Sequence, residues 1–325
     1  NPGDEVIIPA PYWVSYLEIV KVAEGIPVVI AAGIDKDFKI TGAELEAAIT
    51  PKTKLLMFST PCNPTGSVYS KEELQDLARV LAKYPQIVAM SDEIYEHINF
   101  VGKHESLAQF PEIYDQVVTV NGVSKAWAMT GWRLGYIGAP KAIAAACDKV
   151  QGQFTSATCS ITQRATIAAM NTDPTVLKEM IAAFESRRNL VLSGLRNIPG
   201  LKVNNPEGAF YVFPDCSSYF GKTYNGQTIS NSDDLCMYLL EVALVACVGG
   251  AAFEFCAPSI ARSCGSFSAS TRRRRSSFAA ADSARPGSTC WPTSTPPRAW
   301  SSGARKTPRS PAWPRPPCAT SPTTA

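Results

Sequence analysis

The first 138 residues alternate short apolar segments with longer amphipathic ones, and this alternation restricts the fold more than any other feature of the chain. Five segments are short and rich in Val and Ile, as buried strands are: Glu5–Pro9, Pro27–Ala32, Lys54–Ser59, Ile87–Ser91 and Val117–Asn121. Between them lie three predicted helices, Trp13–Ala23, Gly42–Ile49 and Lys71–Lys83. Strands and helices in alternation predict an α/β fold, in which a mostly parallel sheet lies between layers of helices.

Two of these helices have a defined start. Thr41 is followed three residues later by Glu44, and Ser70 by Glu73, which is the spacing of a capping box. In sheets of this class the ligand site lies beyond the carboxyl ends of the strands. We therefore expect three segments to meet at one edge of the sheet: Thr60–Gly66, Asp92–Tyr95 and Ser124–Lys125.

The second half of the chain predicts a different organisation. Two long helical stretches, roughly Ala142–Met170 and Pro174–Arg196, precede a smaller α+β portion. That portion contains two predicted strands and one helix: Leu201–Asn204, Ala209–Pro214 and Asp233–Val242. We expect a large domain at residues 1–196, which is incomplete at its N-terminus, a partial small domain at residues 197–262, and a tail at residues 263–325.

The tail has an unusual composition. Residues 271–325 contain no Leu, Ile, Val, Tyr, Glu or Gln, and they consist mainly of Ser, Pro, Arg, Ala and Thr. Such a segment buries too little apolar surface to offset its conformational entropy on folding. Two interpretations stay open: a disordered tail, or out-of-frame translation of a GC-rich gene, which we favour. Sequencing of the gene distinguishes them.

Composition excludes several classes of protein. No stretch of about 18 apolar residues suggests a transmembrane helix. The ten cysteines form no C-x-x-C pair and have no histidine partner at zinc-ligand spacing, so we expect no metal site. We expect their thiols to be reduced, in an intracellular, soluble protein of the cytoplasm or a plastid. The net charge of +3 is concentrated near the basic run Arg272–Arg275, which leaves a nucleic-acid-binding arm as a minor alternative.

Four segments match, in order, the motifs of one known family. They are Pro11–Tyr16 (P-Y-W-V-S-Y), Thr60–Gly66 (T-P-C-N-P-T-G), Ser91–His97 (S-D-E-I-Y-E-H) and Asn121–Tyr136 (N-G-V-S-K-A-W-A-M-T-G-W-R-L-G-Y). From Asn1 to about Phe253 the chain resembles the class I pyridoxal-phosphate aminotransferases, in particular the aspartate aminotransferase branch. The resemblance implies the fold type I architecture, pyridoxal 5′-phosphate as cofactor, transamination and a homodimer. We expect contacts of that dimer at Tyr12 and residues 155–163.

Lys125 is the expected point of covalent attachment of the cofactor. A lysine amine can attack a carbonyl group and later move a proton, provided that its surroundings keep it deprotonated. An isolated lysine is more often a solvated surface residue. Lys125, however, follows a Val-rich strand and is flanked by the apolar residues Ala126, Trp127 and Met129. We therefore expect the base of its side chain to be enclosed.

Three polar residues have expected roles at the cofactor ring. Asp92 ends an apolar strand, where a carboxylate would stabilise a protonated pyridine nitrogen; a helix cap is the alternative. Tyr95 and Asn63 resemble the family residues that donate hydrogen bonds to the ring oxygen. Their alternatives are a core aromatic and a turn former before Pro64. We expect Lys125, Asp92 and Tyr95 to be catalytic.

The phosphate and the ring face have their own candidates. Arg133 offers a bidentate guanidinium and Ser124 a hydroxyl for the phosphate, although Arg133 could instead form a structural ion pair. Trp13 resembles the aromatic residue that stacks on the ring, with Tyr12 as a weaker candidate and a core role as the alternative.

The substrate contacts are less defined. Asn63 and Trp13 are expected to touch the substrate, and the family binds its α-carboxylate through an arginine of a C-terminal strand. Aligning Ile-Ala-Arg places that arginine at Arg262, whereas aligning Ser-Phe-Ser-Ala-Ser places Cys264 there.

Three hypotheses of function follow. The first is transamination of aspartate or glutamate with 2-oxoglutarate or oxaloacetate, extended to prephenate by the similarity of residues 232–241 to plant and algal enzymes. The second is a pyridoxal-phosphate lyase on the same fold. The third is a non-catalytic fragment of an aminotransferase.

Overall fold

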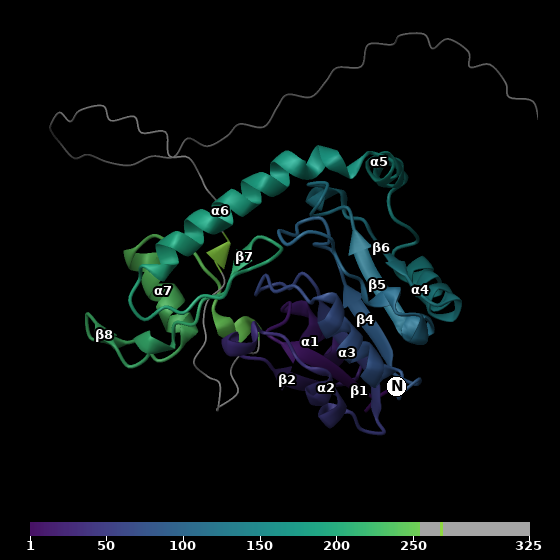
Figure 1. Ribbon diagram of the computed structural model, residues 1–325, viewed down its shortest axis with the longest axis horizontal. Coiled ribbons are helices and arrows are strands. Elements are labelled where there is room, and N and C mark those ends of the chain that lie inside the picture. The colour runs from purple at the N-terminus through teal and green to yellow at the C-terminus, as the bar shows by residue number, and fades with distance from the viewer. Residues whose placement is uncertain (254–266, 269–325) are drawn as a thin grey trace, which may run out of the picture. The chain divides into compact units, whose positions relative to one another are not determined.

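A six-stranded sheet forms the centre of the computed structural model, which describes residues 1–253 and 267–268 of the chain. Its strand order is β2-β1-β3-β4-β5-β6 (Figure 1). The strands are β1 (Glu5–Ala10), β2 (Ile26–Ala31), β3 (Thr53–Ser59), β4 (Val88–Asp92), β5 (Val117–Gly122) and β6 (Gly135–Gly138). Neighbouring strands from β2 to β5 are parallel, and β6 pairs with β5 in the antiparallel direction. The predicted α/β fold with a mostly parallel sheet is confirmed.

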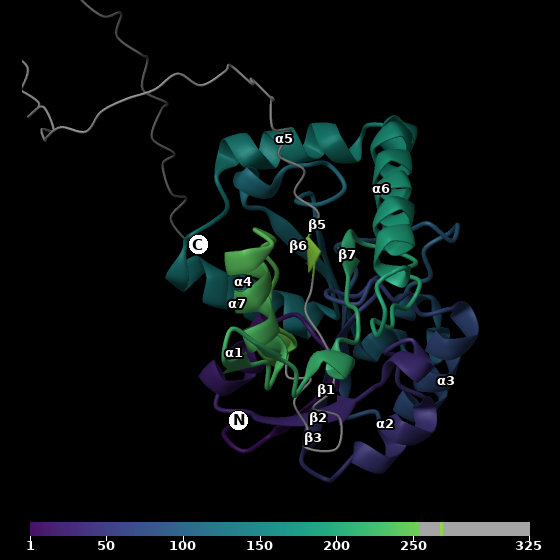
Figure 2. The same ribbon diagram turned by 90° about the vertical axis from the view of Figure 1, so that its left-hand side faces the viewer.

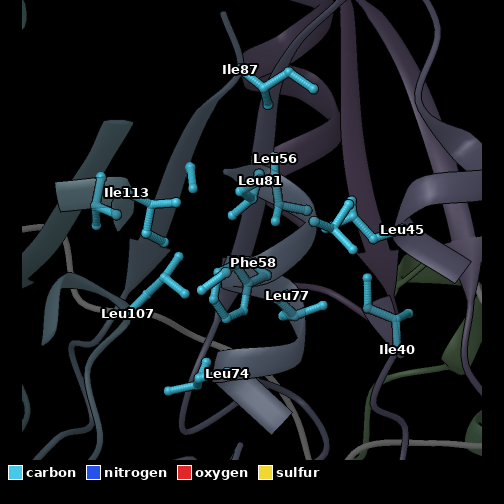
Figure 3. Packing of buried hydrophobic residues seen from close by; sticks show 14 of the residues in the cluster. Ile40, Leu45, Leu56, Phe58, Leu74, Leu77, Leu81, Ile87, Leu107 and Ile113 are labelled. Atoms are coloured by element: carbon cyan, nitrogen blue, oxygen red, sulfur yellow. The ribbon is translucent and has the colours of Figure 1, made fainter. Parts of the chain in front are cut away.

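The two faces of the sheet are covered by different helices. Side chains alternate along a strand, so Ile7, Leu56 and Phe58 all lie on one face. There they pack against α2 (Gly42–Ala48) and α3 (Lys71–Leu81) (Figure 3). The opposite face packs against α1 (Ser15–Val22). Full burial of each leucine in this core contributes on the order of 1.5–3 kcal/mol.

Both predicted capping boxes are present. The hydroxyl of Thr41 accepts a hydrogen bond from the amide of Glu44, and the Glu44 carboxylate accepts one from the amide of Thr41. Ser70 and Glu73 form the same reciprocal pair at the start of α3. These bonds satisfy backbone N–H groups that the first turn of a helix leaves without partners.

The helical region after the sheet is divided more finely than predicted. The expected stretch 142–170 is two helices, α4 (Lys141–Phe154) and α5 (Ser160–Met170). Ser156 has a left-handed φ of 62°, which ends the regular right-handed helix. The next helix, α6 (Lys178–Arg196), follows a 3₁₀ turn at Pro174–Leu177 and passes beside the short strand β7 (Tyr211–Val212) (Figures 1 and 2).

The predicted strand Leu201–Asn204 is wrong. Only Lys202 makes a ladder contact, an isolated antiparallel bridge to Asp215. Asn204 instead turns its side-chain amide to the Asp37 carboxylate at 2.8 Å and to the Thr65 carbonyl at 3.2 Å. These side-chain hydrogen bonds, followed by Pro206, replace the ladder that a strand would need.

The rest of the small portion contains short elements. The predicted strand 209–214 is reduced to β7, which pairs with β10 (Phe267–Ser268), and the predicted helix is α7 (Ser232–Val242). A hairpin of β8 (Thr223–Tyr224) and β9 (Gln227–Thr228) was not predicted. Both residues of its Asn225–Gly226 turn have positive φ angles, as a two-residue hairpin of this type requires.

Several predictions lie outside the described residues. They are Arg262, Cys264 and the composition-based interpretation of residues 271–325. The domain boundaries at 196 and 262 stay predictions. Among the described helices, none is both long and apolar enough to cross a membrane.

Candidate active site

The carboxyl ends of β3, β4 and β5 lie side by side, and the loops that follow them carry the predicted site residues. Asn63 follows β3, Asp92 and Tyr95 lie at the end of β4, and Lys125 follows β5. Parallel strands bring their carboxyl ends to one edge of the sheet. Three segments that are far apart in sequence therefore meet at this edge.

Lys125 is half-buried between aromatic rings. Its amine nitrogen lies 5.7 Å from the centroid of the Tyr95 ring and 5.8 Å from the centroid of the Phe210 ring. Both distances are within the range of a cation–π contact. The rings restrict the movement of the side chain and displace water from part of its surroundings, which is the enclosure expected from the sequence.

Phe210 is itself fixed by a helix. Its ring stacks on Phe184 of α6 at a centroid distance of 5.3 Å. The small portion of the chain thus contributes one wall of the lysine environment. Nothing in the sequence indicated that Phe210 would lie beside Lys125.

Asp92 is a carboxylate that is largely removed from water. Its Oδ2 accepts a hydrogen bond from the hydroxyl of Tyr16 at 2.7 Å, and its Oδ1 accepts one from the amide of Ile94 at 3.2 Å. Burial raises the pKa of the Asp92 carboxyl above its ordinary value, whereas the Tyr16 bond and the charge of Lys125 lower it in part. The site therefore holds an acidic group with less stabilisation of its charge than water would give.

Sequence reasoning missed Tyr16. Its side chain is 3% exposed and its ring meets that of Trp13 edge-on, with the centroids 5.6 Å apart. The available signal was the spacing of three residues between Trp13 and Tyr16, which one turn brings together: the amide of Tyr16 donates to the carbonyl of Trp13 at 2.9 Å, just before α1. Burial, and then the neighbouring Asp92, raise the pKa of the Tyr16 hydroxyl, which stays a donor to the carboxylate.

Tyr95 and Asn63 meet through a third residue. The hydroxyl of Tyr95 lies 2.6 Å from that of Tyr211, and the amide nitrogen of Asn63 donates to the same Tyr211 oxygen at 3.3 Å. Burial, and then the proximity of Tyr211, raise the pKa of Tyr95. The sequence predicted a strand at Ala209–Pro214, which includes Tyr211, but no role for this residue.

Trp13, Asn63 and Tyr211 line one cavity of about 330 Å³, with Val248 and Phe253 among its other lining residues. A cavity of this size lies within the range of small-molecule sites. Trp13 is partly exposed, at 39%, and so presents an aromatic surface to the cavity.

The two predicted phosphate ligands are not arranged as a closed site. Ser124 is half-buried next to Lys125. Arg133 is exposed, has a left-handed φ of 52°, and donates from one guanidinium nitrogen to the carbonyl of Thr130 at 3.0 Å. Its other N–H groups have no hydrogen-bond partner within the part of the chain that the structure describes, so the role of Arg133 stays a prediction.

Comparisons with known proteins agree with this arrangement. The family model for aminotransferase class I and II matches residues 1–274. The bifunctional aspartate aminotransferase and glutamate/aspartate-prephenate aminotransferase of Petunia hybrida is 46% identical over 258 residues, which are 78% of this chain and 54% of the relative. The probable aspartate/prephenate aminotransferase of Rickettsia bellii is 50% identical over 256 residues, which are 78% of this chain and 64% of the relative. The chain therefore spans less than two thirds of the length of these two relatives.

The fold comparison gives the same result. The crystal structure of the aspartate aminotransferase from Rhizobium meliloti matches with a TM-score of 0.79 and 43% sequence identity. The match covers 84% of this chain and 68% of that structure.

Proposed function

Because this chain belongs to the class I and II aminotransferase family, we propose that it transfers amino groups between amino acids and 2-oxo acids. One observation carries the proposal. The Lys125 amine lies near the rings of Tyr95 and Phe210. It is at the edge of the sheet where β4 ends at Asp92 and where Asn63 lies in the loop after β3. An amine, a half-buried carboxylate and a phenol at one site are the groups that such chemistry requires.

These residues fit pyridoxal 5′-phosphate, the cofactor that the family uses. When bound, this group supplies a reactive aldehyde and a protonated pyridine ring that withdraws electrons. Lys125 would hold it covalently, and Asp92 would keep the proton on the ring nitrogen. Tyr95 and Asn63 would donate to the ring oxygen, and Trp13 would cover the ring face. Ser124 and Arg133 would bind the phosphate.

The chain's own groups also define the proton transfer. The Nζ of Lys125 would accept the proton that the substrate Cα releases and would hold it until it is returned to the reacting carbon atoms. The rings of Tyr95 and Phe210, whose centroids lie 5.7 and 5.8 Å from this Nζ, limit the positions that the side chain can take. Asp92 stays fixed during the transfer because Tyr16 and Ile94 hold both of its oxygens.

For the substrate we propose aspartate or glutamate with the corresponding 2-oxo acids, and prephenate as a further acceptor. The printed activities of the Petunia and Rickettsia relatives support this choice. Arg262 is the proposed partner of the α-carboxylate.

A homodimer is proposed on the basis of the family. Of the two places expected to make contacts, Tyr12 is only 2% exposed within the single chain, so it is covered without a partner. Residues 155–163 are mostly exposed and stay the candidate contact.

The test is reconstitution with pyridoxal phosphate, followed by absorption spectroscopy. We expect a visible band that is lost in Lys125→Ala and kept in the matched control Lys149→Ala, because Lys149 is exposed on α4. A band that Lys125→Ala retains would refute the site.

A second assay separates the enzymatic hypotheses. Amino transfer from aspartate to 2-oxoglutarate supports the proposal, whereas release of pyruvate from a sulfur-containing amino acid supports a lyase. A chain that binds no cofactor supports the non-catalytic fragment.

A further inference from the structure

One short segment, residues 206–211, crosses between two parts of the candidate active site. On one side the amides of Glu207 and Gly208 both donate to the carbonyl of Gly66, at 2.8 and 2.9 Å. On the other side the carbonyl of Glu207 accepts from the amide of Phe100 at 2.8 Å. The amide of Ala209 also donates to the carbonyl of Ile98 at 2.8 Å. The segment is therefore fixed between the loop that carries Asn63 and the turn that carries Tyr95.

The backbone of residues 206–211 lies so close to these two loops that Gly208 and Gly66 have no room for a side chain. A Cβ atom on Gly208 would lie 2.6 Å from the Cβ of Pro61 and 3.0 Å from the carbonyl of Ile98. A Cβ atom on Gly66, whose φ is +69°, would lie 2.4 Å from the Cβ of Pro206. Because both positions are glycine, the backbone of residues 206–211 can approach the two loops closely. This close approach fixes the position of Tyr211, where the segment ends.

The segment ends at Tyr211, whose hydroxyl contacts both loops at once. It lies 2.6 Å from the Tyr95 hydroxyl and accepts from the Asn63 amide at 3.3 Å. The rings of Tyr95 and Tyr211 meet edge-on at 5.7 Å. Tyr95 and Asn63 have no direct hydrogen bond in the part of the chain that the structure describes, so Tyr211 is the group through which they are joined.

We propose that Tyr211 is a positioning residue, which holds the Tyr95 hydroxyl and the Asn63 amide in place for the ring oxygen of the cofactor. A phenol hydroxyl both donates and accepts, so Tyr211 can accept from Tyr95 in the free protein and donate to it when Tyr95 donates to a ligand. Hydrogen bonds in such a chain strengthen one another. The inference rests on the proposed function, because it assumes the cofactor at this site.

The perturbation is Tyr211→Phe, which removes one hydroxyl and keeps the ring contact. The matched control is Tyr219→Phe, since Tyr219 also belongs to the small portion and its hydroxyl donates to the carbonyl of Pro199, away from the site. Thermal unfolding of both variants shows whether they are folded.

The first readout uses the cofactor-free protein. The side-chain amide signals of Asn63, identified in NMR spectra by their loss in Asn63→Ala, should shift in Tyr211→Phe and stay in place in Tyr219→Phe. Unchanged signals in Tyr211→Phe would overturn the inference, whether or not the chain binds a cofactor.

The second readout uses the reconstituted protein. We expect the dissociation constant of the cofactor to rise by about three- to tenfold in Tyr211→Phe, in line with the loss of one hydrogen bond. The midpoint of the pH titration of the visible band should rise by about 0.2–0.6 pH unit, since Tyr95 becomes a weaker donor to the ring oxygen. Values equal to those of Tyr219→Phe would overturn the inference. If the unaltered chain shows no band that depends on Lys125, the proposed function fails, and the Asn63 signals alone decide whether Tyr211 joins the two loops.

Discussion

Replacing Tyr16 with Phe should raise the pKa of Asp92 and lower the free energy of unfolding at neutral pH. The hydroxyl of Tyr16 donates to Asp92 Oδ2 at 2.7 Å; Tyr16 is buried and Asp92 is half-buried. A hydrogen bond to an ionised group contributes about 1.5–3 kcal/mol, against about 0.5–1.5 kcal/mol for a neutral pair. Each pKa unit corresponds to about 1.4 kcal/mol, so the difference predicts a rise of about one unit in the pKa of Asp92.

The effect on stability has a defined sign. Burial already raises the pKa of Asp92 in the folded state, so in the cofactor-free chain this carboxyl favours folding below its ordinary pKa and loses that contribution as the pH rises through the folded value. The Tyr16 bond limits the loss, because it stabilises the ionised carboxylate. The cost of Tyr16→Phe should therefore be larger near neutral pH than below about pH 4.

Urea unfolding of the cofactor-free protein at both pH values measures this difference. The matched control is Tyr69→Phe, because Tyr69 is equally buried but its hydroxyl accepts from the amide of Ile40 at 3.0 Å, a bond between neutral groups. The loss in Tyr16→Phe should decrease by about 1 kcal/mol at the lower pH, whereas that in Tyr69→Phe should stay constant. The same loss at both pH values in Tyr16→Phe would refute an interaction with an ionised Asp92.

Three further substitutions test the framework of the site, each by urea unfolding. Gly208→Ala should destabilise the protein by about 1–3 kcal/mol because its Cβ meets Pro61, whereas Gly152→Ala, in an open position of α4, should be neutral or stabilising by up to about 1 kcal/mol. Ser70→Ala removes a capping-box hydroxyl and should cost about 1 kcal/mol, with a larger cost contradicting a purely local role. Leu77→Ala should cost about 2–5 kcal/mol, since its side chain is 1% exposed; a loss below 1 kcal/mol would contradict its place in the core.

Local patterns predicted the central sheet well. The Val- and Ile-rich segments gave β1 to β5 within one or two residues, and the spacing of Ser70 to Glu73 gave the start of α3. The predictions failed where short-range signals were weak or were overruled by distant contacts. β6 has only four residues, two of them glycine, and Asn204 bonds to Asp37 rather than to a ladder partner.

In the candidate active site, too, the residues in local motifs were predicted and the contact between distant residues was not. Lys125, Asp92, Tyr95 and Asn63 were predicted because they lie in recognisable local segments, and the structure places them at one edge of the sheet. Tyr211 was not predicted to join them, because its partner Tyr95 lies 116 residues away in sequence. No local pattern reports a contact at that distance, since the path of the chain between the two residues determines it.

Borohydride reduction of the reconstituted chain tests most directly whether Lys125 holds the cofactor covalently. Reduction makes the bond between the amine and the cofactor permanent, so mass spectrometry of a proteolytic digest can locate it. The added mass of one reduced pyridoxal phosphate should appear on the peptide that contains Lys125. Its appearance on another lysine, or on none, would contradict covalent attachment at Lys125.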